Sequence, residues 1–524
     1  MKLVQSTWFN NYDHVKGNWP EERFALFSMA LSYHLLKKQH LPTRLNTNGI
    51  GFDIIVNMLG LEYDEVDICL EKNRFDPQTS QLFDKYWSLH KLYAYSLQEE
   101  PFIHFDNDVY FYKKLDDSWK SAELVAQNKE FGLSYYTICL EEIQHHFTRI
   151  PRYLDIDPQS VMAVNAGVAG GTRFDFFKQL YREVILFLTD NQSHLESLTD
   201  GFGNIFIEQC FMKKYADSLG IPFKYILPNT VGPSKEYRAN KFHLLPDKVD
   251  YIHVMNYKSN ATTCESIAKM LYHTNRSLYQ HCVQVAGSLQ GRHQPVHKPK
   301  SSDPLSNDVS AKLRYFFRRT NRICELLSDT PLPFSSIELL SEAIYLIGKS
   351  MPGNYFEVLL DVFVFELDRY RFFMALNADL VANIYRNFNT YCDASFENDW
   401  KEYTISMTDT VKLLESRWNW VEGNEFTEIP PNYYLNNTKL PPGHFATLIY
   451  YYPEQNIPKE HPLKICDRLI IQLSKNDILI TELTDLVHQS WEERDKIVFS
   501  ENYIEERIRF LVFQGVFAIT KQIN

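Results

Sequence analysis

The sequence predicts an α/β fold with a mixed sheet flanked by helices, followed by a mainly helical region and a compact C-terminal region of helices and strands. Short apolar strands alternate with helical periodicity through the first part of the chain, which is typical of α/β domains. One of these strands ends in two aspartates, Asp106 and Asp108. Helical periodicity then dominates after a segment rich in Pro, Ser and basic residues. These three observations define the predicted domain order.

The composition is that of an ordinary globular protein. The chain has 524 residues, of which 44% are apolar and 23% are charged, and it fits two or three domains at roughly 150 residues each. Aromatic residues make up 15%, which fits large cores or surfaces that stack on carbohydrate. The net charge of −12 disfavours nucleic acid or an anionic membrane as a partner, because such binding depends on Lys and Arg neutralising phosphates.

Targeting and redox signals indicate a cytoplasmic protein. Residues 1–8 turn polar after a few positions, unlike a secretory signal peptide. No run approaches the roughly 18 apolar residues of a membrane span, so none is expected. The eight cysteines are scattered and include no Cys-x-x-Cys pair. We therefore expect reduced, mostly buried thiols.

The first elements alternate regularly between strand and helix. Residues 3–7 form the first predicted strand. Pro20 and the two glutamates after it begin a helix that runs to about residue 38, since Pro and acidic residues favour a helix N-terminus. The elements predicted next are strand 43–47, helix 52–59, strand 65–70, helix 79–97 and strand 102–106. This order is typical of a nucleotide-binding half-domain.

The end of strand 102–106 carries the most informative motif. Strand side chains alternate between faces, so Asp106 and Asp108 can point the same way at the carboxyl edge of the sheet, where α/β proteins bind ligands. Two carboxylates suit Mg²⁺ or Mn²⁺, which is commonly held by one or two carboxylates and the phosphates of a nucleotide. A turn with solvated carboxylates is the alternative interpretation, because Asp and Asn are frequent in turns.

The segment after the acidic pair supplies the rest of the predicted sheet. Strands are expected at 109–113, 123–128, 160–171 and 251–254, and helices at 135–147, 175–188 and 205–219. Strand 160–171 contains small residues that permit a ligand to approach the backbone, but its glycines match neither a dinucleotide-binding nor a P-loop motif. Helix 135–147 carries two Glu/His pairs at i,i+4 spacing, which are either metal ligands or solvated surface pairs: Glu141, Glu142, His145 and His146.

Four motifs in this order resemble the GT-A fold of metal-dependent nucleotide-sugar glycosyltransferases, in particular the retaining group that includes glycogenin and bacterial galactosyltransferases. The segment Asp106-Asn107-Asp108 resembles the Asp-x-Asp metal motif, and Asn165-Ala166-Gly167 resembles a turn on the donor-sugar side. Glu208-Gln209 resembles an acidic-Gln pair of a later helix, and His253 resembles the histidine that completes the metal site. The chain is also similar to a group of uncharacterised bacterial proteins.

The resemblance implies a donor, a metal and a set of site residues. The donor would be a UDP-sugar, and Mn²⁺ or Mg²⁺ would stabilise the diphosphate that leaves the sugar. The metal would be held by Asp106, Asp108 and His253. The catalytic residues would be Glu208, Gln209 and Asn165. The residues that bind the donor would be Asn165, Ala166, Gly167, Lys258, Gln5 and Thr47.

The chain departs from the family pattern at two places. Asn256 stands where a Gly usually follows the histidine, and Lys258 comes one residue early. Glu208 replaces the commoner Asp, and its extra methylene changes the reach of the carboxylate.

Domain boundaries are predicted from composition and periodicity. A nucleotide-sugar-binding domain is expected over residues 1–284, a linker rich in Pro, Ser and Lys over 285–310, a mainly helical domain over 311–440 and a winged-helix-like domain over 441–524. Helices are expected at 311–327, 337–349, 356–370 and 380–391. The first of these carries four arginines that either meet an acidic partner or form a solvated face: Arg314, Arg318, Arg319 and Arg322.

The C-terminal region has the element order of a winged helix, with strand 469–473, helices 480–489 and 503–514, and strand 515–520. Between residues 481 and 509 eight carboxylates oppose four Lys or Arg residues, which disfavours DNA binding. The order is similar to that of winged helices that bind leader peptides for peptide-modifying enzymes. Packing against the helical domain is the alternative.

Two functions from different classes are therefore consistent with the sequence. The first is a metal-dependent glycosyltransferase whose acceptor is a peptide or protein recruited by the C-terminal region. The second is a non-catalytic copy of the fold that serves as a scaffold or peptide-binding partner in a biosynthetic pathway.

Overall fold

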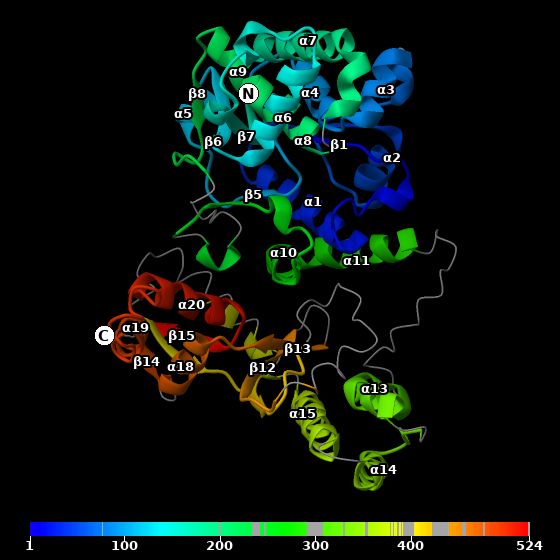
Figure 1. The fold of residues 1–524 in the computed structure, drawn as a ribbon, viewed down its shortest axis with the longest axis vertical. Coiled ribbons are helices and arrows are strands. Elements are labelled where there is room, and N and C mark those ends of the chain that lie inside the picture. The colour runs from blue at the N-terminus through cyan, green and yellow to red at the C-terminus, as the bar shows by residue number, and fades with distance from the viewer. Residues whose placement is uncertain are drawn as a thin grey trace. The chain divides into compact units, whose positions relative to one another are not determined.

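The protein is described by a computed structural model that divides it into two compact units (Figure 1). The first unit comprises Met1–Phe242 and Val249–His293, and the second comprises His243–Lys248 and Gln294–Asn524. The structure describes residues 1–75, 77–198, 201–232, 241–245, 248–290, 308–327, 331–351, 355–377, 379–380, 382–384, 387–388, 390, 403–421, 439, 441–452, 457–474 and 477–521.

A seven-stranded mixed sheet organises the first unit, in the order β3-β2-β1-β4-β7-β6-β8. Strands β1, β2, β3 and β4 run parallel, β7 is antiparallel to both β4 and β6, and β8 is parallel to β6. A separate antiparallel pair joins β5 to β9. The bounds are β1 Lys2–Thr7, β2 Thr43–Thr47, β3 Glu65–Ile68, β4 Phe102–Phe105, β5 Val109–Phe111, β6 Leu124–Phe131, β7 Met162–Gly171, β8 Phe223–Tyr225 and β9 Tyr251–His253. The predicted α/β fold of the GT-A, Rossmann-like type is thus confirmed.

The central strands contribute side chains to two hydrophobic cores, because successive side chains of a strand point to opposite faces of the sheet. Val4 and Phe102 belong to a large core, while their neighbours Leu3 and Ile103 belong to a second core that includes Leu36. All of these side chains are almost fully buried. The alternation fixes the register of β1 against β4, since a shift by one residue would exchange the two faces.

Helices cover both faces of this sheet (Figure 1). On one side α4 packs against α7, and on the other α1 packs against α10 and α11. The predicted helix 79–97 is two helices, α3 and α4, and the predicted helix 205–219 is interrupted by a π-helix at Phe206–Cys210. The bounds are α1 Glu22–Lys37, α2 Gly49–Phe52, α3 Pro77–Lys85, α4 Ser88–Ser96, α5 Asp117–Lys120, α6 Ser134–His146, α7 Phe174–Asp190, α8 Phe202–Ile205, α9 Phe211–Ser218, α10 Ala261–Thr274 and α11 Arg276–Gln290.

The second unit combines helices with two three-stranded sheets, β11-β12-β13 and β14-β10-β15. Four of its strands were not predicted, namely β10 to β13, and two of them interrupt the region expected to be mainly helical. The strand bounds are β10 Tyr403–Met407, β11 Val411–Ser416, β12 Phe445–Tyr452, β13 Ile457–Pro462, β14 Ile478–Leu479 and β15 Phe517–Lys521. The helix bounds are α12 Val309–Phe316, α13 Arg318–Leu327, α14 Ile337–Ser350, α15 Tyr355–Ala375, α18 Ile465–Leu473, α19 Ile480–Gln489 and α20 Glu501–Phe513.

The predicted strand 469–473 is wrong, because these residues end helix α18. A short apolar run does not by itself separate a strand from a buried helix. The helix is favoured by Asp467, whose carboxylate accepts the Lys464 backbone N–H at 3.3 Å, and by the burial of Cys466 and Ile470 four residues apart. The predicted helix 380–391 lies partly outside the described residues.

Residues 285–290 of the predicted linker 285–310 belong to α11, which ends at Gln290; its residues 291–307 lie outside the described part of the chain. The cysteines of the described residues are all buried and unpaired, as predicted. Within the same residues, no helix is both long and apolar enough to cross a membrane.

Candidate metal centre

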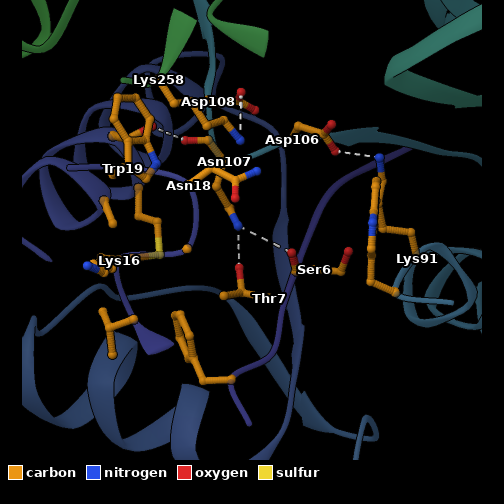
Figure 2. Close-up of a pocket in the computed structure, with 17 residues that line it drawn as sticks. Ser6, Thr7, Lys16, Asn18, Trp19, Lys91, Asp106, Asn107, Asp108 and Lys258 are labelled. Atoms are coloured by element: carbon orange, nitrogen blue, oxygen red, sulfur yellow. Dashed lines mark hydrogen bonds and ion pairs between the residues drawn. The ribbon is translucent and has the colours of Figure 1, made fainter. Parts of the chain in front are cut away.

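A pocket of about 250 Å³ opens at the carboxyl ends of the parallel strands β1 and β4 (Figure 2). This is the edge at which α/β sheets bind ligands, because the strands end there and the loops diverge. Its walls come from the ends of the two strands, the loop before α1, α1 itself and α4, and they are formed by Ser6, Thr7, Phe9, Val15, Lys16, Gly17, Asn18, Trp19, Ala25, Ser28, Met29, Trp87, Lys91, Asp106, Asn107, Asp108 and Lys258.

The structure brings Asp106, Asp108 and His253 together, and the two aspartates line this pocket. One ligand atom from each residue lies within 4.8 Å of the others. The aspartates follow β4, and the histidine ends β9, which pairs with β5 so that Val109 lies opposite His253. The acidic pair and the histidine are thus joined by a strand pairing between segments far apart in the sequence.

Asp108 is buried between two cationic or potentially cationic groups. Its Oδ2 lies 3.1 Å from the Lys258 ammonium, and its Oδ1 lies 3.6 Å from Nε2 of His253. Burial alone would raise the pKa of Asp108, but Lys258 and His253 outweigh burial and hold the pKa well below its usual range. The carboxylate is therefore ionised at neutral pH, as a metal ligand must be.

Asp106 is held by a lysine that also holds Glu208. The Lys91 ammonium lies 2.8 Å from Oδ1 of Asp106 and forms an ion pair with Oε1 of Glu208. Burial would lower the pKa of Lys91, but the two carboxylates reverse this and raise it well above the ordinary value. Burial raises the pKa of Glu208, and Lys91 opposes that rise. Lys91 is thus a permanent buried cation that joins β4 to the π-helix.

A neutral histidine and a tyrosine complete the surroundings of this lysine. His104 contacts the Ser6 hydroxyl through Nε2 at 2.8 Å, and Tyr95 donates a hydrogen bond to Oε1 of Glu208 at 3.3 Å. Burial, assisted by Lys91, lowers the pKa of His104 well below its usual value. The positive charge at this end of the pocket therefore belongs to Lys91 alone among these three residues.

The π-helix Phe206–Cys210 carries Glu208 into contact with Lys91. A π-helix inserts an extra residue into a helical turn and rotates the following side chains, and such segments are frequent at functional sites. Gln209, the next residue, faces elsewhere: its Oε1 accepts a hydrogen bond from the hydroxyl of Tyr136. Gln209 does not line the pocket.

The other predicted donor-binding residues are occupied by internal contacts. Asn165 donates to Oε1 of Glu130 at 2.9 Å and accepts from the Gly167 N–H at 3.0 Å. Gln5 donates to Ser32 at 3.0 Å, and Thr47 donates to the Thr7 carbonyl at 2.6 Å. The structure does not bring these three side chains to the pocket wall. Lys258 does line the pocket, while the Ala166 carbonyl faces Lys91 at 3.4 Å.

Several pocket residues were missed by sequence reasoning. Lys91 lies within a helix whose other residues are mostly apolar, and its burial was the missing information. Lys16 and Trp19 belong to the loop before α1, and Trp19 also lies beneath the Lys258 ammonium, 5.9 Å from its ring centroid. The one signal for Lys91 in the sequence is a lysine among the mostly apolar residues of its helix. Lys is rarely buried without a partner, so such a lysine indicates a nearby carboxylate.

The residues present fit a divalent cation. Two carboxylates and one imidazole form a hard to intermediate donor set that suits Mn²⁺, and Mg²⁺ with the help of phosphate oxygens. His253 donates through Nδ1 to Oε1 of Gln127 at 2.6 Å, so in the neutral imidazole the lone pair is on Nε2, on the side of Asp108. The helix α6 residues Glu141, Glu142, His145 and His146 are not among the potential metal-binding groups found in the described residues.

Comparison with known proteins places the chain in a family. Residues 1–285 match the model described as "Family of unknown function (DUF6734)". The chain belongs to this family. Comparison with curated proteins gave no match. Among solved structures, the chain is similar to mouse xyloside xylosyltransferase 1 in its apo form, with 13% identity and a TM-score of 0.28 over 43% of this chain and 85% of that chain.

Proposed function

We propose that the N-terminal unit of this DUF6734 protein is a divalent-metal-dependent glycosyltransferase that takes its sugar from a nucleotide-diphosphate sugar such as a UDP-sugar. The observation that carries the proposal is the group of Asp106, Asp108 and His253, of which the two aspartates line a pocket at the carboxyl ends of parallel strands. This is where a metal held by two carboxylates can share its coordination with nucleotide phosphates.

The charges around the pocket support a diphosphate ligand. The carboxylates of Asp106, Asp108 and Glu208 are matched in number by the ammonium groups of Lys16, Lys91 and Lys258. A bound divalent cation would therefore give this region an excess of positive charge, which complements a diphosphate. A neutral ligand would gain nothing from that excess.

The proposed roles follow from these positions. Asp106, Asp108 and His253 would hold Mn²⁺ or Mg²⁺, which supplies Lewis-acid stabilisation of the leaving diphosphate. Lys258 lies at the pocket wall with its side chain 30% exposed, so its ammonium can approach a phosphate as a point charge. Lys91 keeps Asp106 and Glu208 in place and carries a charge that faces the same pocket.

Transfer with retention of configuration is the finer part of the proposal. In this part of the proposal Glu208, Gln209 and Asn165 are the catalytic residues that contact the reacting sugar. In the structure Glu208 is bound to Lys91 and Tyr95, so a sugar hydroxyl would have to exchange with one of these partners. The peptide acceptor recruited by the C-terminal region is a proposal of the same kind.

A second candidate is favoured by a specific observation. Asn165 and Gln209 are held by Glu130 and Tyr136 and do not line the pocket. A protein that binds a metal and a nucleotide but does not transfer the sugar would need neither side chain free. The second candidate is therefore a non-catalytic scaffold that keeps the binding site.

Thermal unfolding tests the proposal directly. A ligand that binds only the folded state raises the melting temperature by mass action. We expect UDP with Mn²⁺ to raise the melting temperature more than the sum of the two ligands alone. Absence of any nucleotide diphosphate effect, across several bases and with either metal, would contradict the proposal.

Donor hydrolysis then separates the two candidates. A transferase commonly releases its sugar slowly to water, whereas a scaffold binds the donor and leaves it intact. Metal-dependent stabilisation without hydrolysis of any bound UDP-sugar would favour the scaffold.

A further inference from the structure

The hydrogen bonds behind His253 form a chain that starts at a backbone carbonyl. Nδ2 of Asn128 donates to the Lys129 carbonyl at 3.1 Å, and a carbonyl oxygen can only accept. Oδ1 of Asn128 is therefore the atom that faces Gln127, and it accepts from Nε2 of Gln127 at 2.9 Å. This orients the Gln127 amide, because its nitrogen donates to Asn128 and its oxygen must point the other way.

The oriented amide determines the tautomer of His253. Oε1 of Gln127 lies 2.6 Å from Nδ1 of His253 and accepts from the Tyr251 hydroxyl at 2.7 Å. Since an amide oxygen only accepts, the proton of His253 must be on Nδ1. In the neutral imidazole Nε2 then carries the lone pair, 3.6 Å from Oδ1 of Asp108. The side chains of Gln127, Tyr251 and His253 are all buried, so water does not compete for the hydrogen bonds between them.

A glycine provides the space for this contact. A Cβ atom at Gly167 would lie 2.5 Å from Nδ1 of His253 and 2.6 Å from Oε1 of Gln127, which is closer than real Cβ contacts allow. The Gly167 carbonyl also accepts the Asp106 N–H at 2.9 Å. The small residue of β7 therefore touches both the histidine and the backbone of an aspartate of the metal group.

We propose that Gln127 is a positioning residue that fixes the Nδ1-protonated tautomer and the orientation of His253 and thereby sets the metal affinity, with Gly167 required to admit the contact. The proposal rests on the proposed function, since it assumes that His253 is a metal ligand. It adds a residue that no sequence motif indicated. Outer partners of this kind orient a ligating imidazole and raise its basicity.

The test compares Gln127→Met and Gln127→Glu by calorimetric titration with Mn²⁺ in the full-length protein. Methionine keeps the volume but removes the acceptor, and we expect the Mn²⁺ affinity to fall by about 10- to 100-fold. Glutamate keeps an acceptor oxygen toward Nδ1 of His253 but loses the donor to Asn128, and we expect a smaller loss of affinity than in Gln127→Met. Gly167→Ala should reduce the affinity in the same way as Gln127→Met, because the added methyl group occupies the hydrogen-bond region.

The matched control is Gln98→Met, which removes another buried glutamine whose amide donates to the Ala94 carbonyl. It should leave the Mn²⁺ affinity unchanged. A second readout is the ¹⁵N spectrum of the histidines, with His253 identified by its loss in His253→Gln. The Nδ1-protonated signature should be present in the wild type and lost in Gln127→Met, an effect that a merely structural role would not produce.

The outcomes separate this inference from the proposed function. A wild-type protein that binds no Mn²⁺, with or without nucleotide, overturns both. A wild-type protein that binds Mn²⁺, together with a folded Gln127→Met that binds it equally well, overturns only the role of Gln127. If Gln127→Met does not fold, a neutral His253 with its proton on Nε2 in the wild type overturns the inference.

Discussion

Asp108 illustrates how much one residue's surroundings add to a motif. The sequence predicts only that it lies at the carboxyl edge of the sheet, whereas the structure shows that its side chain is 7% exposed and lies between Lys258 and His253. Its charge is therefore stabilised by specific partners and is not merely solvated. Asp106 is more accessible, with a side chain that is 24% exposed, so the two aspartates differ in what each contributes to a bound cation.

Substitution of either aspartate by asparagine should abolish Mn²⁺-dependent binding of a nucleotide diphosphate while the protein stays folded. The fold is expected to survive because Lys258 is partly exposed and Lys91 retains Glu208 as a partner. Calorimetry of Asp106→Asn and Asp108→Asn measures the effect. Asp117→Asn, at an aspartate whose side chain is 91% exposed, is the control. Metal-dependent affinity like that of the wild type in both variants would remove the carboxylates from the metal site.

His90 is predicted to make the protein acid-sensitive. Burial lowers its pKa from 6.5 to about 4, so the unfolded chain binds a proton at this residue between these pH values and the folded chain does not. The contribution of His90 to stability is therefore complete above pH 6.5 and is lost as the pH falls toward 4. At about 1.4 kcal/mol per pKa unit, the loss is on the order of 3 kcal/mol.

His90→Phe should flatten this pH dependence while preserving the stacking on Trp8, whose ring centroid lies 4.2 Å away. Urea unfolding at pH 7.5 and pH 5 measures the difference. The wild type should lose more stability than the variant on acidification. Two parallel curves would show that His90 is not responsible. His461, whose pKa burial lowers to about 4, lies in the second unit and contributes equally to both curves.

The candidate metal ligands were accessible from the sequence because each belongs to a short motif. Lys91 and Gln127 were not, because their roles depend on tertiary contacts with Glu208 and His253, each more than 100 residues away in the chain. The role of a buried polar side chain depends on its partner in the fold, and local periodicity does not show which residue that partner is. The same reason explains why Asn165 and Gln5 were assigned to the donor although they bind internal groups.

At the scale of elements, α13 shows how a sequence pattern can conceal burial. Arg319 belongs to a stripe of four arginines that was interpreted as either a solvated face or a docking surface, yet its side chain is fully buried. It pairs with Glu366 of α15 and Glu460 of β13, and Arg369 of α15 pairs with the same Glu460 at 2.8 Å. The charges connect two helices and a strand, which no single helical wheel could reveal.

Glu460→Gln should destabilise the second unit strongly. Glu460 is the carboxylate that the two arginines share, and they hold its pKa at about 2 against the effect of burial. Loss of its charge would remove the carboxylate that pairs with both buried guanidinium groups, and breaking a buried pair costs about 3 to 5 kcal/mol. Thermal unfolding measures the change.

The control for this experiment is Glu357→Gln on α15, where the carboxylate meets Arg417 at the surface with both side chains more than half exposed. It should change stability by less than about 1 kcal/mol. Equal effects of the two substitutions would show that the buried network contributes no more than a surface pair.

Strands were less predictable than helices at this scale. The parallel strands of the first unit are apolar runs next to clear turn signals, and they were found. β10 to β13 belong to small sheets with exposed faces and were missed. The sheet β14-β10-β15 takes its central strand from residues 403–407, well before the predicted domain boundary at residue 441. A strand whose partners come from later in the chain carries little local signal.

At the scale of the whole molecule, the division into units does not follow the chain. Residues 243–248 belong to the second unit although they lie between β8 and β9 of the first. Leu244 and Leu245 are buried, the His243 ring meets Phe510 of α20 with centroids 5.6 Å apart, and Lys248 pairs with Glu505 at 3.4 Å. The chain then returns to β9, which ends at His253.

A chain that ends at residue 440 should therefore lose more than a region that recruits an acceptor. It lacks α20, so His243 and Lys248 lose their contacts with Phe510 and Glu505 only a few residues before β9. We expect a lower melting temperature and weaker Mn²⁺ binding than in the full chain, together with loss of transfer to a peptide acceptor. Calorimetry and a transfer assay measure these effects. Unchanged Mn²⁺ affinity would show that β9 holds His253 without this segment, and full transfer would make the C-terminal region purely structural.

The path of residues 243–248 also limits how such a protein can change over time. A single recombination event near residue 290 would exchange the second unit but would leave behind six residues that belong to it. The hybrid would lack Phe510 and Glu505, with which His243 and Lys248 are in contact. A new C-terminal half can therefore be acquired only with matching changes in a hexapeptide encoded well upstream, so the two halves are expected to be inherited together.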